Sequence, residues 1–178
     1  MRRKFTIVEL LVVIGVITLL AALVFPATQR FRAQGLKTQC LNNLHQLGIS
    51  LNSYVIDYKS HLPVIPTMTP ESPKDPFWLN NVLGLSPETY HCSADSQPKY
   101  DGQTYFGRYG SSYEWNVMCN GMRIDNKTVA SMVVNGVTVD ITDVPLMTDA
   151  DDFHGKLGKN CLYADGRTTR NLEGVKVE

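Results

Sequence analysis

The sequence has no excess of charge of either sign. It contains 17 Lys and Arg residues against 17 Asp and Glu residues, so its formal net charge is zero. Proteins that bind nucleic acid through phosphate contacts normally carry a clear basic excess or a basic patch. We therefore expect no nucleic-acid partner. A length of 178 residues allows one globular domain of ordinary size with an appendage.

Cysteine pairs of the C-x-x-C type are also absent. The four cysteines, Cys40, Cys92, Cys119 and Cys161, are spread along the chain, which argues against a zinc ribbon or a thioredoxin-like redox motif. Disulfide bonds outside the cytoplasm are the expected use of these residues. Four cysteines allow three pairings, and the residues alone do not choose among them.

Charged residues are nearly missing from the long hydrophobic run at residues 5–25, where Glu9 is the single exception. A helix of this length spans roughly 31 Å, about the thickness of a bilayer core. A cleavable signal peptide would end at a small-x-small site, which residues 23–27 lack. The run predicts a single transmembrane helix. The basic residues 2–4 before it favour a cytoplasmic N-terminus and an extracytoplasmic head.

Glu9 needs compensation, because a carboxylate inside a membrane helix costs about 2.5–3.5 kcal/mol. One interpretation is that Glu9 lies near the cytoplasmic interface and reaches the headgroups. The other is that it pairs with a buried cation. If the chain is cut before Phe5, the new amino group is such a cation, and pairing with a neighbouring chain would fix the stagger between subunits.

The helical pattern continues after Pro26, which we expect to bend the helix rather than end it. Apolar residues recur at helical spacing through the predicted amphipathic stalk, residues 26–58: Leu36, Cys40, Leu44, Leu47, Leu51, Tyr54 and Tyr58. Gly35 and Gly48 each weaken this helix by about 1 kcal/mol relative to Ala. The pattern predicts one helix from residue 5 to about residue 58, with the apolar stripe packed on a head domain.

The head, residues 59–178, begins with a proline-rich stretch at residues 63–76 that predicts an extended loop. Short strand-like runs follow, the first at residues 105–113. Residues 133–139 surround an Asn-Gly pair and residues 161–168 an Asp-Gly pair, and both patterns predict β-hairpins. A helix followed by strands predicts an α+β fold in which a small antiparallel sheet packs against the stalk.

The C-terminal part contains residue types for two kinds of chemistry. Cys161, His154 and Asp165 are the residue types of a thiol hydrolase triad, but no oxyanion loop is recognisable, so we do not expect an enzyme. The several aspartates between residues 143 and 165 offer oxygen ligands for calcium. The simpler interpretation is that residues 149–152 form a solvated turn and that His154 donates a structural hydrogen bond.

The segment FTIVELL at residues 5–11 resembles the start of type IV prepilins and type II secretion pseudopilins. The resemblance implies that residues 1–4 are a basic leader, removed between Lys4 and Phe5 by a membrane-embedded prepilin peptidase that methylates Phe5. Glu9 would then be the residue that sets register during assembly. Pro26 falls where helices of this family carry a kink-forming proline.

The rest of the chain resembles a bacterial branch of prepilin-type proteins with a C-terminal His, a spacer and Asp-Gly, here His154, Asp165 and Gly166. The similar segments are CLNNLHQLGISLNSY, FWLNNVLG, YHCSAD, YGSSYEWN and FHGKLGKNCLYADG. This resemblance implies a pilin-like fold and a Cys40–Cys92 disulfide. Because some pseudopilins hold calcium in the C-terminal loop, it also makes Asp149, Asp151 and Asp165 weak calcium candidates; no other cofactor is expected.

The resemblance implies a structural subunit of the inner membrane that assembles through its N-terminal helix into a pilus or pseudopilus. Its partners would be other copies of itself, pilin-like subunits, the peptidase, the assembly platform and the lipid bilayer. The alternative is a membrane-anchored binding protein that stays uncleaved because Lys4 replaces the usual Gly. Its head would bind a ligand through aromatic residues: Trp78, Tyr105, Phe106, Tyr109, Tyr113 and Trp115.

Overall fold

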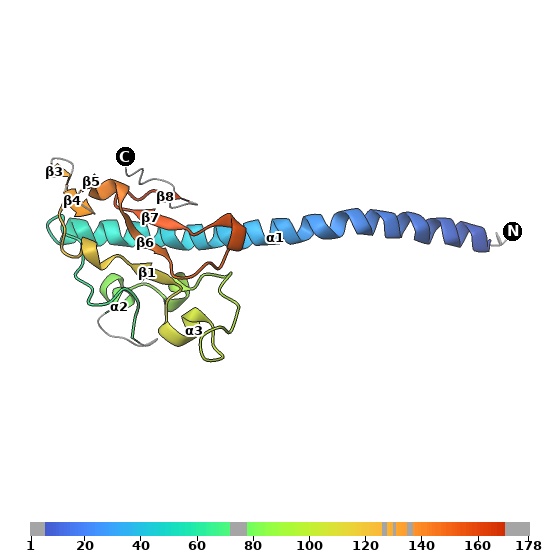
Figure 1. The fold of residues 1–178 in the computed structure, drawn as a ribbon, viewed down its shortest axis with the longest axis horizontal. Coiled ribbons are helices and arrows are strands. Elements are labelled where there is room, and N and C mark those ends of the chain that lie inside the picture. Colours follow the sequence, from blue (N-terminus) through green and yellow to red (C-terminus); the bar gives the residue numbers. More distant parts are fainter. Residues whose placement is uncertain (1–5, 72–77, 126–127, 130, 135–136, 170–178) are drawn as a thin grey trace. The chain divides into compact units, whose positions relative to one another are not determined.

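The computed structural model describes residues 6–71, 78–125, 128–129, 131–134 and 137–169. The chain divides into two compact units, Met1–Gly35 and Leu36–Glu178. The first unit holds the N-terminal part of helix α1, and the second holds the rest of that helix together with the strands and short helices (Figure 1).

Helix α1 extends from Ile7 to Asp57, close to the predicted bounds. It continues through position 26, so Pro26 does not end it. The helix ends where the backbone turns back on itself: Ser60 N donates to Val55 O at 2.8 Å, and Lys59 and Ser60 both adopt positive φ. The prediction of one helix across the proposed membrane span and stalk is confirmed.

The buried stripe of α1 consists of Cys40, Leu44, Leu47, Leu51 and Val55. The predicted stripe continued instead through Tyr54 and Tyr58, and this part of the prediction was wrong. Tyr54 is half-buried and Tyr58 is exposed. The two rings stack on each other with their centroids 4.0 Å apart. A step of four residues from Leu51 keeps Val55 over the core, whereas the tyrosines lie one position to the side.

The main sheet is antiparallel and has the strand order β1-β6-β7-β8. Its strands are β1 (Tyr113–Trp115), β6 (Pro145–Asp149), β7 (Cys161–Tyr163) and β8 (Thr168–Thr169). Figure 1 shows β6 and β7 lying against the C-terminal half of α1. All three residues of β7 are buried, as expected for a central strand with both faces covered. The predicted α+β layout of a long helix with a small antiparallel sheet is confirmed.

Both predicted hairpins have paired strands. Strands β7 and β8 pair across the Asp165-Gly166 turn. In this turn Gly166 has φ +81°, and Arg167 N donates to Asp165 Oδ1 at 2.9 Å. Strands β4 (Ser131–Val134) and β5 (Val137–Asp140) pair with Val134 opposite Val137. The Asn-Gly pair between them lies outside the described residues. A further short ladder joins β2 (Ile124–Asp125) to β3 (Thr128–Val129).

The run at residues 105–113 is not a strand throughout, contrary to the prediction. Its first part is the helix α3 (Tyr105–Tyr109). Thr104 caps this helix by accepting from Gly107 N at 3.0 Å, and Gly110, at φ +84°, ends it. The aromatic residues suggested a strand, but the capping residues on both sides decided the local structure.

The remaining helices of the described chain are short. They are α2 (Leu79–Leu83), η1 (Pro87–Tyr90), η2 (Val117–Cys119), η3 (Ile141–Asp143) and η4 (Gly155–Leu157). Residues 62–71 contain no helix and no strand, in agreement with the predicted extended loop. This loop is held by Asn120, which accepts from Ile65 N and Trp115 Nε1 and donates to Ile65 O.

Two of the three glycines of α1, Gly35 and Gly48, are not equivalent, although the sequence pattern treats them alike. A Cβ added at Gly48 would lie 2.8 Å from Cδ1 of Leu162, a fully buried side chain of β7, whereas a Cβ at Gly35 would meet nothing within 4 Å. We expect Gly48→Ala to lower the free energy of unfolding by about 1–2 kcal/mol through overpacking. Gly35→Ala should raise helix stability by about 0.5–1 kcal/mol.

Urea unfolding of the full chain in detergent, followed by circular dichroism, measures both effects. Equal stabilisation by the two substitutions would show that Leu162 moves aside at no cost, and would contradict the close packing of α1 on β7.

Candidate functional site

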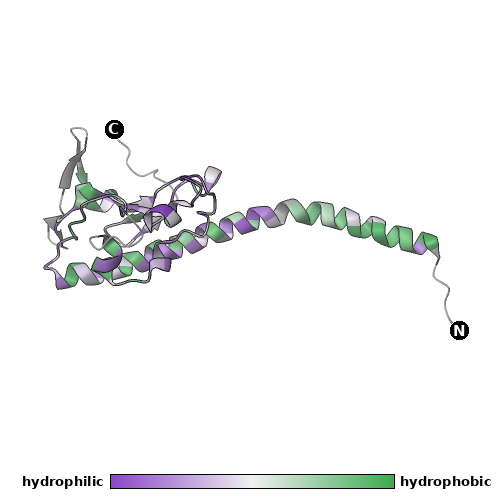
Figure 2. Ribbon diagram, turned by 90° about the horizontal axis from the view of Figure 1, so that it is seen from below, coloured by the Kyte–Doolittle hydropathy of each residue, from purple (hydrophilic) through white to green (hydrophobic). Residues whose placement is uncertain are grey.

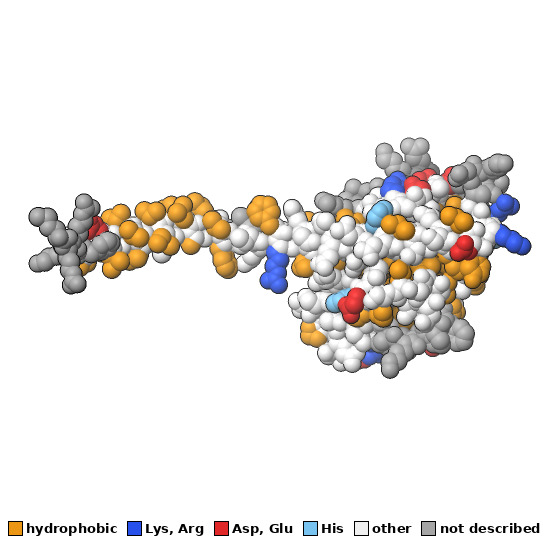
Figure 3. Space-filling model, turned by 180° about the vertical axis from the view of Figure 1, so that it is seen from behind, with side chains coloured by type: hydrophobic (Ala, Val, Ile, Leu, Met, Phe, Trp, Pro, Cys, Tyr) orange, Lys and Arg blue, Asp and Glu red, His pale blue; other side chains and the backbone are white. Residues whose placement is uncertain are grey.

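The first unit presents an apolar surface. Every side chain from Ile7 to Phe25 is exposed, and all but a few are hydrophobic. Figure 2 shows the hydrophobic colour running along this part of α1, and Figure 3 shows hydrophobic side chains covering its surface. Within the described residues, α1 is the one helix long and apolar enough to cross a membrane. The first unit therefore has the length and composition of a membrane anchor.

Glu9 lies in the first turn of α1 and is bonded to Thr6. Its Oε2 accepts from Thr6 N and from Thr6 Oγ1, both at 2.8 Å, and Thr6 Oγ1 accepts from Glu9 N at 3.2 Å. This reciprocal pattern is a capping box, with Thr6 before the first helical residue and Glu9 three positions later. This role of Thr6 and Glu9 was not among the predictions, although Thr-x-x-Glu before an apolar run is its signal.

Three of the predicted processing and assembly residues are not placed. Lys4 and Phe5 lie outside the described residues. Pro26 lies within α1, but its side chain is likewise outside the described part of the structure. Cleavage before Phe5 and a bend at Pro26 therefore stay predictions.

In the second unit, Cys40 of α1 and Cys92 form a disulfide, with their Cα atoms 5.0 Å apart. This is the pairing that the family resemblance implies. His154 Nε2 lies 3.4 Å from Cys92 Sγ, and the His154 side chain is almost completely buried. Cys119 and Cys161 are free and buried. The disulfide ties the helix to the head, and His154 packs directly on it.

Other polar groups surround His154. Asn160 Nδ2 lies 3.1 Å from His154 Nε2, and Asp149 Oδ2 lies 3.5 Å from the same nitrogen. Asn160 N also donates to Asp149 Oδ2 at 2.7 Å. Lys37 is buried, and its Nζ donates to the carbonyl oxygens of Leu157 and Gly158. One helix, one strand and one loop thus bring a buried amine, a carboxyl group and an imidazole together beside a disulfide.

Burial sets the charge of this cluster. It raises the pKa of the Asp149 carboxyl to about 7, against the hydrogen bonds from Asn160 and the charge of Lys37. It also lowers the pKa of His154 to about 4, and the positive charge of Lys37 acts in the same direction. His154 is therefore neutral near pH 7, so its contact with Asp149 is not an ion pair there. Asp149 Oδ1 is buried without a hydrogen-bond partner.

The residues of the C-terminal motif have separate structural roles. His154 belongs to the buried cluster, whereas Asp165 and Gly166 make the turn between β7 and β8. Cys161 is buried in β7, and burial raises the pKa of its thiol to about 11. A thiol with a raised pKa is the opposite of an activated nucleophile. The three triad candidates, Cys161, His154 and Asp165, therefore do not have the arrangement of a hydrolase triad.

The weak calcium candidates also have different surroundings. Asp149 is fully buried, and Asp165 is exposed beside the guanidinium of Arg167. Asp151 Oδ2 accepts from Tyr100 Oη at 2.7 Å and lies 3.4 Å from Lys99 Nζ. Among the described residues, these three aspartates do not form a group of converging carboxylates.

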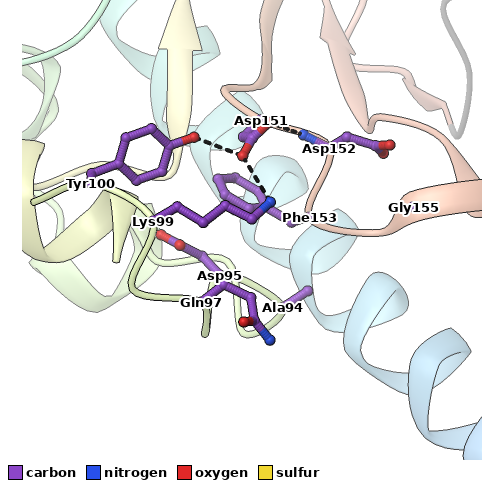
Figure 4. A pocket seen from close by; sticks show the side chains of 9 residues that line it. All are labelled: Ala94, Asp95, Gln97, Lys99, Tyr100, Asp151, Asp152, Phe153 and Gly155. Carbon is purple, nitrogen blue, oxygen red and sulfur yellow. Dashed lines mark hydrogen bonds and ion pairs between the residues drawn. The ribbon is translucent and has the colours of Figure 1, made fainter. Parts of the chain in front are cut away.

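A pocket of about 210 Å³ lies next to this region and is shown in Figure 4. Tyr100, Lys99 and Asp151 converge on one of its sides, and Phe153 lies beside them. Burial and the neighbouring Asp151 raise the pKa of Tyr100 to about 12, so its hydroxyl keeps its proton and donates it to that carboxylate. The pocket is polar and aromatic, and two of its charged groups, Lys99 and Asp151, already pair with each other.

The aromatic residues predicted to bind a ligand are mostly core residues. Trp78, Tyr113 and Trp115 are fully buried, and Tyr105 is 9 % exposed. Phe106 and Tyr109 are half-buried. Because stacking with a sugar or peptide needs an accessible ring face, the first four rings do not form a binding platform.

Comparisons of this chain with models of known protein families, with curated proteins and with solved structures gave no match.

Proposed function

We propose that this protein is a pilin-like or pseudopilin-like subunit, anchored in the inner membrane and assembled through α1 into a filament. The observation that carries the proposal is the exposed apolar surface of Ile7–Phe25 with a single acidic residue, Glu9, in its first turn. A surface of this kind is stable only in lipid or against other apolar helices. The basic leader and the FTIVELL segment add the processing signal.

Assembly requires an interaction that fixes the axial register between subunits, because apolar contacts alone let a helix slide along its neighbours. Glu9 provides this interaction if its carboxylate pairs with the amino group that cleavage creates on Phe5 of a neighbouring chain. The capping box gives Glu9 a partner before assembly, since Thr6 satisfies one carboxylate oxygen. Among the described residues Glu9 has no ion-pair partner, and in the filament the amino group of Phe5 on a neighbouring chain would supply one.

Two substitutions separate the charge of Glu9 from its capping role. Glu9→Gln keeps an oxygen that accepts from Thr6 but removes the charge, and we expect incorporation into filaments to fall at least about tenfold, given the cost of an unpaired charge in lipid. Thr6→Ala keeps the carboxylate and weakens the cap by about 1 kcal/mol. Its incorporation should stay within about fivefold of the wild type, since about 1.4 kcal/mol corresponds to tenfold.

Filament incorporation is measured by quantifying each variant in sheared surface filaments against its level in the membrane. The opposite ranking, with Thr6→Ala defective and Glu9→Gln normal, would reduce Glu9 to a helix cap and remove the basis of the register argument.

The pocket in Figure 4 favours one alternative, a membrane-anchored binding protein whose head takes a small polar ligand. The two functions differ at the N-terminus of the native protein. A chain that begins with methylated Phe5 supports assembly, whereas an intact chain beginning at Met1 supports a permanent anchor. Mass spectrometry of the protein from native membranes distinguishes them.

A further inference from the structure

We propose that Cys40, Cys92 and His154 bind a zinc ion when the Cys40–Cys92 disulfide is reduced, so that the disulfide and the metal site exclude each other. This inference is independent of filament assembly. Within the described residues, this is the one group of three or more His, Cys, Asp or Glu side chains whose donor atoms lie within 4.8 Å of one another.

The geometry is close to that of a zinc site. Zinc binds cysteine sulfur at about 2.3 Å and histidine nitrogen at about 2.0–2.1 Å with tetrahedral angles, which places ligand atoms roughly 3.5–3.8 Å apart. Cys92 Sγ and His154 Nε2 are already 3.4 Å apart. Reduction needs only to let the two sulfur atoms separate from bonding distance to that range, and their Cα atoms are 5.0 Å apart.

Asp149 supplies the fourth donor. Its Oδ2 lies 3.5 Å from His154 Nε2, the same nitrogen that Cys92 approaches. Its Oδ1 is completely buried and has no hydrogen-bond partner. Asn160 Nδ2 now donates to the lone pair of His154 Nε2, and this hydrogen bond would break so that the lone pair can bind the metal. Asp149 lies outside the group of three, so its side chain must move toward the sulfur atoms to complete a tetrahedral site, and the bound zinc ion would then satisfy the buried carboxylate.

The charges balance in the metal-bound form. Two thiolates neutralise the zinc ion, and the ammonium of Lys37, which acts electrostatically on Asp149, neutralises its carboxylate. A buried cluster of zero net charge avoids the large cost of an isolated buried ion. The oxidised form contains no thiolate, so it lacks the ligands for zinc.

The redox step requires a dithiol reductant. Two electrons and two protons from the dithiol break the S–S bond and leave two thiols on the protein, while the reductant becomes a disulfide. Zinc binding then releases the two thiol protons as the thiolates bind the metal. Re-oxidation of the thiols would expel the ion.

The test uses the full-length chain in detergent, unfolded and reduced with a phosphine reductant and then refolded with or without Co²⁺ as a probe for zinc. We expect the reduced chain to bind one Co²⁺ and to show sulfur-to-cobalt charge-transfer absorption. The same chain with its disulfide intact should show neither. This comparison needs no substitution.

Substitutions then locate the site. His154→Gln and Asp149→Asn should each weaken Co²⁺ binding at least about tenfold. Cys119→Ala, which removes a buried thiol outside the group, should leave it unchanged. Zinc should also slow the re-formation of the disulfide by at least about tenfold, because it holds both thiolates.

Three results would overturn the proposal. These are equal Co²⁺ binding by the oxidised and reduced chains, unchanged affinity in His154→Gln, and a reduced chain that refolds without taking up the metal.

Discussion

Replacing Asp95 with Ala is expected to lower the free energy of unfolding of the head by about 3–5 kcal/mol, since it removes three hydrogen bonds to one buried carboxylate. Asp95 is 4 % exposed. Its Oδ1 accepts from Tyr105 N at 3.1 Å, and its Oδ2 accepts from Phe106 N at 2.7 Å and from Ser112 Oγ at 2.9 Å. The substitution leaves these donors in the interior without an acceptor.

Asp95 has this effect because it joins three segments. It follows the disulfide residue Cys92, whose carbonyl accepts from Asp95 N at 2.8 Å. It satisfies the first two backbone N–H groups of α3, and it holds Ser112 just before β1. Losing Asp95 therefore loosens the loop on one side of the disulfide and the start of the sheet together.

Asp95→Asn is the matched control. Its side-chain oxygen still accepts, but its NH₂ group faces donors, so we expect about half of the loss caused by Asp95→Ala. Urea unfolding followed by tryptophan fluorescence reports on both variants through the buried Trp78 and Trp115. If both substitutions cost less than about 1 kcal/mol, a typical single hydrogen bond, the carboxylate is not the organising group described here.

Local patterns predicted the elements whose signals lie within a few residues. The 3.6-residue period gave α1 from near Phe5 to near Tyr58, and the Asp-Gly pair gave the β7–β8 turn. The proline-rich stretch gave the loop after α1. Each is decided by neighbours in the chain, through side-chain spacing, turn chemistry or a missing N–H.

The buried cluster was not predictable in the same way. The cluster joins parts of the chain that are more than 100 residues apart. Lys37 lies in α1, Asp149 at the end of β6, and His154 in the loop that follows. Nothing in the neighbourhood of Lys37 indicates that its ammonium is buried, because a lysine in an amphipathic helix normally faces solvent. Likewise, Asp95 lies in the segment YHCSAD with no local signal of its role, which depends on its hydrogen bonds to the first residues of α3.

One error came from a helical step rather than from a long-range contact. Helical spacing allows Leu51 to be followed by either Tyr54 or Val55, and the predicted stripe continued through Tyr54. The core selects Val55. Where the residues at i+3 and i+4 are both apolar, helical spacing alone does not decide which of the two faces the core.

The second large effect is expected from removing the disulfide. Cys40 and Cys92 are 52 residues apart in sequence. A cross-link that closes a loop of that size lowers the entropy of the unfolded chain and so raises the free energy of unfolding by about 4 kcal/mol. We expect the double substitution Cys40→Ala and Cys92→Ala to lower the free energy of unfolding by about 4–6 kcal/mol, the cross-link supplying most of the loss and two deleted core sulfur atoms the rest.

Cys119→Ala separates these two contributions, because it deletes one fully buried sulfur that forms no cross-link. We expect it to cost about 1 kcal/mol. The unfolding measurements are made in buffer that contains a metal chelator, so that metal bound to thiols does not stabilise the folded protein. If the double variant loses only twice what Cys119→Ala loses, then Cys40 and Cys92 do not restrict the unfolded chain, and α1 is held to the head by its apolar stripe and the hydrogen bonds of Lys37.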